Sequence, residues 1–252
     1  MNSTKLRARH ALLGLMACVL VTATSGTAAA APGPVLIDDF STGAYNLTIR
    51  ANKDLSMQQG SMAGGVRCPL LDTTVDPYNR ENHLGLGSGH MFVETGVRVQ
   101  HAMTLMYGWD KTCAGAGKMD LDLSGLDRFR IDFDLVSLDL AGAMSVWSPS
   151  PDGIQLEGFS SISICGDGVA ADVSFTCDMP FNAFAGNVDW SDVQYIGIVF
   201  QSAGTIMAHE YALNSIRAIN APNAAAGQQR STAPATAPPA PRPLPTIPRP
   251  GR

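Results

Sequence analysis

The residues with the clearest chemical potential are aromatic side chains placed beside polar ones. Within residues 106–111, Tyr107 and Trp109 are separated by one glycine and followed by a carboxylate, at the expected end of a strand. Sugars present apolar C–H faces that stack on such rings, while carboxylates, amides and cations bind the hydroxyl groups. The residues expected to contact a ligand are Tyr78, Arg80, Tyr107, Trp109, Asp110 and Trp147. The competing interpretation places these rings in a core, as we expect for Trp190.

A second constellation consists of oxygen donors. Asp38 and Asp39 end a short apolar strand, and Asn214 lies on the expected last strand. These three side chains could hold a structural Ca²⁺ ion, although Ca²⁺ takes about six to eight oxygen ligands. The alternative is that the carboxylates lie in a solvated turn. We expect no other cofactor.

The cysteines indicate disulfides rather than a metal site. Cys68, Cys113, Cys165 and Cys177 lie beyond the N-terminal segment, and an even number in an exported chain predicts two disulfides. Zinc is disfavoured because no C-x2-C pair occurs. Pairing of neighbours, Cys68–Cys113 and Cys165–Cys177, is the default among three connectivities. However, a hairpin of 160–164 with 172–176 would hold the second pair more than about 20 Å apart, so the hairpin or that pairing must be wrong.

Motifs of the common enzyme classes are missing or incomplete. There is no G-x-S-x-G and no H-E-x-x-H, and residues 113–118 lack key positions of a phosphate-binding loop. A glycosidase needs two carboxyl groups flanking the scissile bond. The four glutamates are all isolated: Glu81, Glu94, Glu157 and Glu210. We therefore expect no enzyme, and keep a weak polysaccharide hydrolase using aspartates as a third hypothesis.

The two ends of the chain differ from its middle. Residues 1–30 combine early basic residues, an apolar run at 11–23 and small residues, which predicts a secretory signal peptide cleaved after Ala30. A lipoprotein signal ending at Cys18 is the less favoured alternative, because its apolar run would be short. Residues 221–252 hold nine of the 16 prolines and no aromatic residue. This composition predicts a disordered, partly polyproline-II tail.

The remaining body, residues 31–220, is strongly acidic. It contains 10 basic and 22 acidic residues, a net charge of −12, whereas the tail carries four arginines and no acid. Such a body repels nucleic acid and anionic membrane surfaces, and the predicted signal peptide implies no membrane insertion. Glycans, cations and basic partners remain. We expect a secreted monomer, with the cell wall as a second location.

Along the body the apolar residues alternate with a period of two. In residues 129–135, Phe129, Ile131 and Phe133 alternate with charged residues, which predicts a strand with one wet face. Residues 195–201 are nearly all apolar and predict a central strand buried on both faces. Further strands are expected at 35–40, 45–49, 91–99, 101–107, 118–123, 143–148 and 169–176. The expected fold is all-β: a two-sheet antiparallel β-sandwich of the jelly-roll type.

The order of four short motifs resembles the galactose-binding-like jelly rolls, which include carbohydrate-binding modules and the complex-I intermediate-associated family. The motifs are Ile37-Asp38-Asp39-Phe40, the Gly-Gly-x-Arg segment 62–67, the turn segments 181–184 and 188–193, and the closing strand 211–217. They bracket nearly the whole body. Asn214 and Ser215 depart from the family's usual Asp-Asn, which puts a shared cation site in doubt.

These observations predict a secreted, non-catalytic β-sandwich module that binds a glycan or a cell-wall polysaccharide. The alternative is a structural or protein-interaction module of the cell envelope that lacks a sugar site.

Overall fold

The computed structural model describes residues 32–114, 119–137, 140–149, 155–163, 174–202 and 208–221. These residues fall within one compact unit, Pro32–Arg252. The predicted signal peptide, nearly all of the predicted tail, and Cys165 lie outside the described residues. Among the residues that are described, no helix has the length and apolar character needed to span a membrane.

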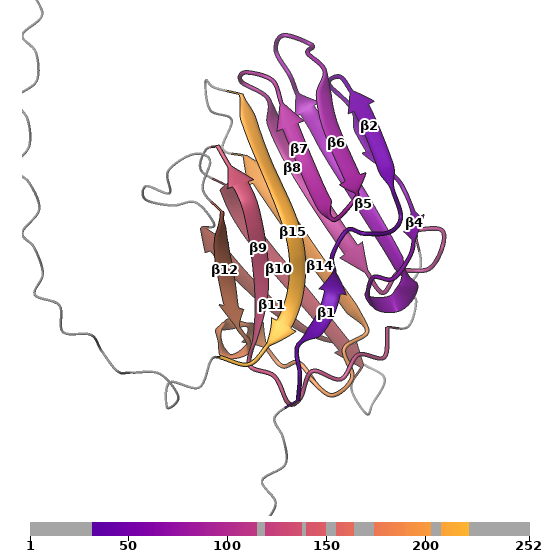
Figure 1. The fold of residues 1–252 in the computed structure, drawn as a ribbon, viewed down its shortest axis with the longest axis vertical. Coiled ribbons are helices and arrows are strands. Elements are labelled where there is room, and N and C mark those ends of the chain that lie inside the picture. Colours follow the sequence, from indigo (N-terminus) through magenta and orange to yellow (C-terminus); the bar gives the residue numbers. More distant parts are fainter. Residues whose placement is uncertain are drawn as a thin grey trace, which may run out of the picture. The chain divides into compact units, whose positions relative to one another are not determined.

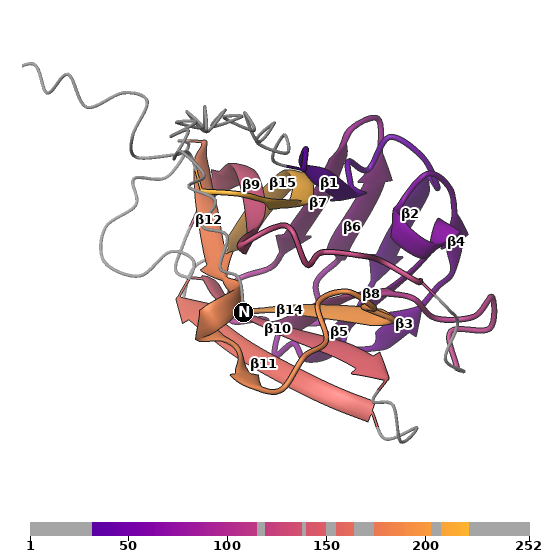
Figure 2. The same cartoon turned by 90° about the horizontal axis from the view of Figure 1, so that it is seen from below.

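Two antiparallel sheets form the described part of the chain (Figure 1), and Figure 2 shows them as two packed layers. The seven-stranded sheet runs in the order β12 (Phe175–Pro180), β9 (Arg128–Val136), β15 (His209–Ile219), β7 (His90–Thr95), β6 (Asn82–Gly87), β2 (Tyr45–Ile49), with β1 (Val35–Asp38) also paired to β15. The eight-stranded sheet runs in the order β13 (Ala185–Gly186), β11 (Gln155–Ser163), β10 (Leu140–Pro149), β14 (Tyr195–Ser202), β8 (Gln100–Tyr107), β5 (Val66–Val75), β3 (Lys53–Leu55), with β4 (Gln58–Gln59) also paired to β5. Two short 3₁₀ turns, η1 (Ala63–Gly65) and η2 (Phe181–Ala183), complete the elements. The predicted all-β sandwich is confirmed.

The core lies between the sheets and follows the alternation of the strands. On β9, Phe129, Ile131 and Phe133 are buried, as the sequence predicts. On β8 every second residue from His101 to Tyr107 is buried, while the residues between them are half-buried. Strands buried on one face and partly exposed on the other have this pattern.

Some predicted elements differ from the structure. Strand β14 is central, as expected, but its outward side chains Tyr195 and Val199 are half-buried rather than buried. In place of a strand at 118–123, the described residues 119–123 form only one isolated bridge, between Leu121 and Val193. The hairpin considered for 160–164 and 172–176 does not form among the described residues, because β11 and β12 belong to different sheets.

Candidate functional site

Three aromatic rings gather on the outer face of the eight-stranded sheet. Tyr195 lies between two tryptophans: its ring centroid is 4.6 Å from that of Trp147 and 5.6 Å from that of Trp109. All three side chains are half-buried. We call Trp109, Tyr195 and Trp147 the aromatic platform.

The strand register explains why two of these rings point outward. Tyr195 on β14 lies directly opposite Trp147 on β10. The next residues along β14, Ile196 and then Ile198, are fully buried, so Tyr195 must occupy the other face. A Cβ atom added at Gly197 would lie 2.6 Å from the Tyr195 hydroxyl, which shows that the tyrosine ring covers this glycine. The absent side chain therefore lets the ring lie along the sheet.

A glycine also directs the third ring. Gly108 follows directly after β8 and has a φ of +81°, a conformation that favours glycine. A Cβ atom added at this residue would overlap the Gln194 carbonyl oxygen. The turn at Gly108 brings Trp109 against Tyr195, with their rings at 67° to one another. The position of Trp109 thus depends on the backbone freedom of one residue.

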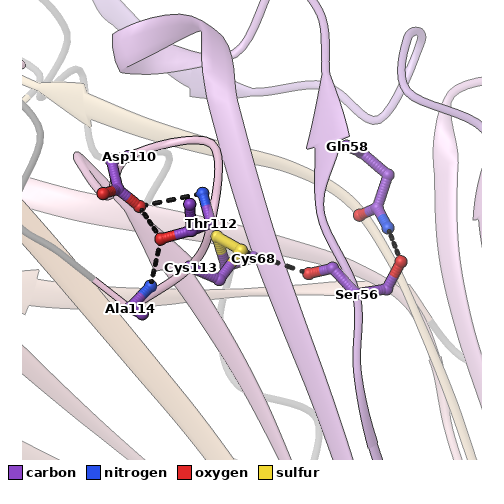
Figure 3. Close-up of a disulfide and its surroundings, with 7 residues drawn as sticks. All are labelled: Ser56, Gln58, Cys68, Asp110, Thr112, Cys113 and Ala114. Atoms are coloured by element: carbon purple, nitrogen blue, oxygen red, sulfur yellow. Dashed lines mark hydrogen bonds between the residues drawn. A yellow bond between two sulfur atoms is a disulfide. The ribbon is translucent and has the colours of Figure 1, made fainter.

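A disulfide holds the loop that carries Trp109. Cys68 on β5 is bonded to Cys113, with their Cα atoms 5.8 Å apart, which confirms the first predicted pair. Trp109 packs against this bridge. In the same loop, Asp110 accepts hydrogen bonds from the Thr112 backbone N–H at 2.8 Å and hydroxyl at 2.6 Å (Figure 3). The disulfide therefore ties the loop to β5, and the aspartate hydrogen bonds stabilise the turn within the loop.

The indole N–H groups of the platform are not part of its surface. Those of Trp109 and Trp147 are buried and have no acceptor within the described part of the chain. A buried donor without an acceptor costs about 1–3 kcal/mol. The platform therefore offers a ligand the exposed parts of its ring faces for stacking, rather than these donors.

The strands around the platform present mainly apolar side chains, together with the hydroxyl groups of Thr104 and Ser145. Outward positions on the neighbouring strands hold Met106, Val199 and Leu70, all half-buried, and Leu55, which is 46% exposed. The outer face of the other sheet is different, because arginine–aspartate pairs such as Arg130–Asp178 cross it. The two outer faces therefore suit ligands of different polarity.

Aspartates dominate the loops next to the platform. Gln194, which precedes Tyr195, donates its amide N–H groups to Asp120 at 2.8 Å and to Asp192. Asp122 and Asp189 are exposed, and hydrogen bonds from nearby serines lower the pKa of each carboxyl. The Asp122 and Asp189 carboxylates are therefore ionised at neutral pH and give this end of the sandwich a negative charge.

The structure places the residues that were expected to contact a ligand in three different parts of the molecule. The expectation that Tyr107 contacts a ligand is wrong. Its side chain is fully buried and faces the core, where its hydroxyl donates to the Asp38 carboxylate at 2.9 Å. Tyr78 and Arg80 lie together in a second place, with the Arg80 guanidinium 5.7 Å from the Tyr78 ring centroid. They line an open groove of about 680 Å³ with residues of the β7–β8 loop. That groove lies at the start of β8 and the platform at its end, about 23 Å away at 3.3 Å per residue.

The predicted calcium ligands are likewise not brought together. The Asp38 carboxylate is buried and bonded to the Arg67 guanidinium at 2.7 Å, while Asp39 accepts from Ser41. Asn214 donates its amide to Asp134 at 2.8 Å instead. Within the described ranges, no group of three His, Cys, Asp or Glu side chains could hold a metal ion. Each of the three side chains has a different partner, so the described structure does not bring them together, and a structural Ca²⁺ ion stays a prediction.

Among the platform residues, sequence reasoning missed Tyr195. The signal was present in the alternation of residues 195–200, where isoleucine and phenylalanine occupy every second position. The run was interpreted as a strand buried on both sides, which hid the outward tyrosine. The second predicted disulfide stays a prediction, since Cys165 lies outside the described residues.

Comparisons with known proteins agree with the predicted resemblance at the level of the fold. No protein-family model and no curated protein sequence matches the chain. A family 11 carbohydrate-binding module from Clostridium thermocellum, solved in complex with a β-1,3-1,4-mixed-linked tetrasaccharide, matches with 14% identity and a TM-score of 0.37, covering 75% of this chain and 96% of that one. A family 30 module of a Clostridium thermocellum cellulosomal cellulase matches with 17% identity and a TM-score of 0.33, covering 70% and 99%. An agarase matches with 11% identity and a TM-score of 0.34, covering 76% of this chain but 25% of the agarase.

The chain is therefore similar to carbohydrate-binding modules, as its sequence motifs predict. With TM-scores below 0.5, these likenesses do not identify a ligand or a binding residue. The function must be argued from the side chains of this chain.

Proposed function

We propose that this protein is a secreted, non-catalytic β-sandwich module that binds a neutral glycan on the aromatic platform. The observation that carries the proposal is the grouping of Tyr195 and Trp147 on neighbouring strands with Trp109 of the disulfide-bonded loop. Aromatic faces held by strands can stack on sugar rings without a large loss of side-chain entropy.

The immediate neighbours favour an uncharged ligand. The strands that flank the platform present Met106 and Val199, and the nearest loops present aspartates. The aspartates of the nearest loops outnumber exposed Lys111 of the Trp109 loop, so an anionic polysaccharide would be repelled overall. Neutral sugar rings would instead stack on the platform.

A protein-interaction module without a sugar site is the second candidate. One observation favours it: Leu55 is 46% exposed and, with half-buried Leu70, extends the apolar face away from the platform. Exposed apolar patches of this kind also mark protein interfaces. In this case the contact surface would centre on the leucines rather than on the tryptophans.

The test measures binding of the chain from Ala31 onward to a panel of neutral polysaccharides by affinity electrophoresis and calorimetry. Trp147→Ala should weaken binding about tenfold, which corresponds to about 1.4 kcal/mol. Trp147→Phe keeps an aromatic face and should retain most of the affinity. Tyr78→Ala, an exposed aromatic in the other groove, is the matched control and should bind as the wild type does.

Three outcomes would change the conclusion. Equal binding by wild type, Trp147→Ala and Trp109→Ala would reject the aromatic platform. Absence of binding to every polysaccharide, together with a protein partner lost on Leu55→Ser, would favour the interaction module. Release of soluble sugars during incubation would favour a hydrolase.

A further inference from the structure

We propose that the Pro- and Arg-rich segment 230–252 of this chain docks on its own aromatic platform. The segment lies beyond the last described residue, and the inference goes beyond the proposed function because it needs no glycan. The inference rests on the position of Ala221, the length of the segment that follows it, the proline-rich composition of that segment, and its positive charge.

The described chain ends on the same end of the sandwich as the platform. The Ala221 backbone N–H donates to the Asp127 carboxylate at 2.8 Å. The preceding segment 121–126 is hydrogen-bonded to segment 190–193, which leads directly into Tyr195. A chain leaving Ala221 therefore starts at the same end of the sandwich as the platform, from the seven-stranded sheet.

The remaining length is sufficient to reach the rings. Twenty residues separate Ala221 from Pro241, and an extended polyproline-II chain covers about 3.1 Å per residue, or about 60 Å in total. The platform spans strands β10 and β14 and the end of β8, which is about 10 Å across at 4.8 Å per strand. The segment can therefore pass round the end of the sandwich and still lie across all three rings.

The composition of the segment suits an aromatic surface. Residues 241–250 read Pro-Arg-Pro-Leu-Pro-Thr-Ile-Pro-Arg-Pro, with a Pro-x-x-Pro spacing at Pro245 and Pro248. Polyproline-II segments of this kind bind between aromatic side chains and lose little conformational entropy, because their backbone is already extended.

The charges are complementary. Segment 230–252 carries Arg230, Arg242, Arg249 and Arg252 and no acid. The loops bordering the platform carry Asp120, Asp122, Asp189 and Asp192. Arg242 and Arg249, each flanked by prolines, would face these carboxylates while the prolines cover the aromatic rings. Attraction between exposed charges is screened by salt, so docking should weaken as ionic strength rises.

Docking predicts that the chain covers its own ligand site. A ligand that uses the platform would have to displace the segment, so its apparent affinity would fall by the fraction of molecules in which the platform is covered. The segment would then act as an internal competitor, released by a tighter ligand or by salt.

The experiment measures acrylamide quenching of tryptophan fluorescence in the chain from Ala31 to Arg252, with no glycan present. Trp190, whose ring centroid is 3.9 Å from that of Phe181, is half-buried, and its contribution is measured in the variant with Trp109→Phe and Trp147→Phe. Arg242→Glu with Arg249→Glu should raise the quenching constant about twofold, since both platform tryptophans become accessible. Arg242→Lys with Arg249→Lys keeps the charge and is the matched control. Wild type in 1 M salt should behave like the glutamate variant.

Three results would overturn the proposal. The first is equal quenching of wild type and the glutamate variant. The second is a difference that persists when Trp109 and Trp147 are replaced by Phe, because the reporter would then be elsewhere. The third is a difference that disappears on dilution, since docking within one chain does not depend on protein concentration. None of these readings depends on glycan binding, so the proposal and the proposed function fail independently.

Discussion

Acid should destabilise the fold through a histidine buried between the sheets. His101 on β8 is 4% exposed and packs against His209, with ring centroids 5.4 Å apart, and against Tyr211 at 5.8 Å. Its Nδ1 lies 3.4 Å from the Thr95 hydroxyl, and its Nε2 has no partner among the described residues. Burial, followed by repulsion from His209, lowers the pKa of His101 from 6.5 to about 3.

The sign of the effect follows from this pKa. The unfolded chain takes up a proton at His101 near pH 6.5, whereas the folded chain does so only near pH 3. Stability from this group is therefore complete above about pH 6.5 and is lost as the pH falls towards 3. The loss approaches about 1.4 kcal/mol per pH unit below pH 6.5, which amounts to about 2 kcal/mol between pH 6.5 and 4.5.

The assay is urea unfolding followed by tryptophan fluorescence at pH 7.5, 6.5, 5.5 and 4.5. His101→Gln removes the titrating group, so its free energy of unfolding should fall less steeply with pH than that of the wild type. His83→Gln, on the outer face of the sheet, is the control and should keep the wild-type slope. Parallel curves for wild type and His101→Gln would falsify the reasoning. The carboxylates with lowered pKa values lose their contributions below about pH 4, outside this window.

Three further predictions concern the parts that support the platform. Reducing the Cys68–Cys113 bridge, which closes a loop of 45 residues, should lower the free energy of unfolding by about 4 kcal/mol, as measured by urea unfolding with and without reductant; unchanged unfolding would show that the loop is held by packing alone. Arg67→Met leaves the Asp38 carboxylate buried without its cation and should lower the free energy of unfolding by about 3–5 kcal/mol in the same assay. A decrease below about 1 kcal/mol would contradict a buried ion pair. Gly108→Ala should lower the melting temperature by several degrees and increase the solvent exposure of the tryptophans, because the added Cβ meets a backbone carbonyl; unchanged melting and fluorescence would show that the turn tolerates a side chain.

The sheets were largely predictable because their patterns are local. The alternation at Phe129, Ile131 and Phe133 is set by one buried face, and it identified β9 with its inward residues. The closing strand was found from its resemblance to a jelly-roll motif and appears as β15. Strand β5 was missed because Arg67, Pro69 and Asp72 interrupt its apolar pattern. Arg67 is nevertheless fully buried, and its charge is balanced by Asp38, which lies 29 residues earlier in the sequence.

The candidate site was predictable only in part, because its geometry depends on one turn. Tyr107 and Trp109 are two residues apart, and a continuous strand would have placed them on the same face. Strand β8 instead ends at Tyr107, and the positive φ of Gly108 reverses the chain. Tyr107 then faces the core and bonds to Asp38, while Trp109 joins Tyr195 on the outer face. An aromatic pair in the sequence thus becomes one core residue and one surface residue. The partner that completes the platform comes from a strand that starts 86 residues after Trp109, and only the register of β14 with β10 and β8 places it there.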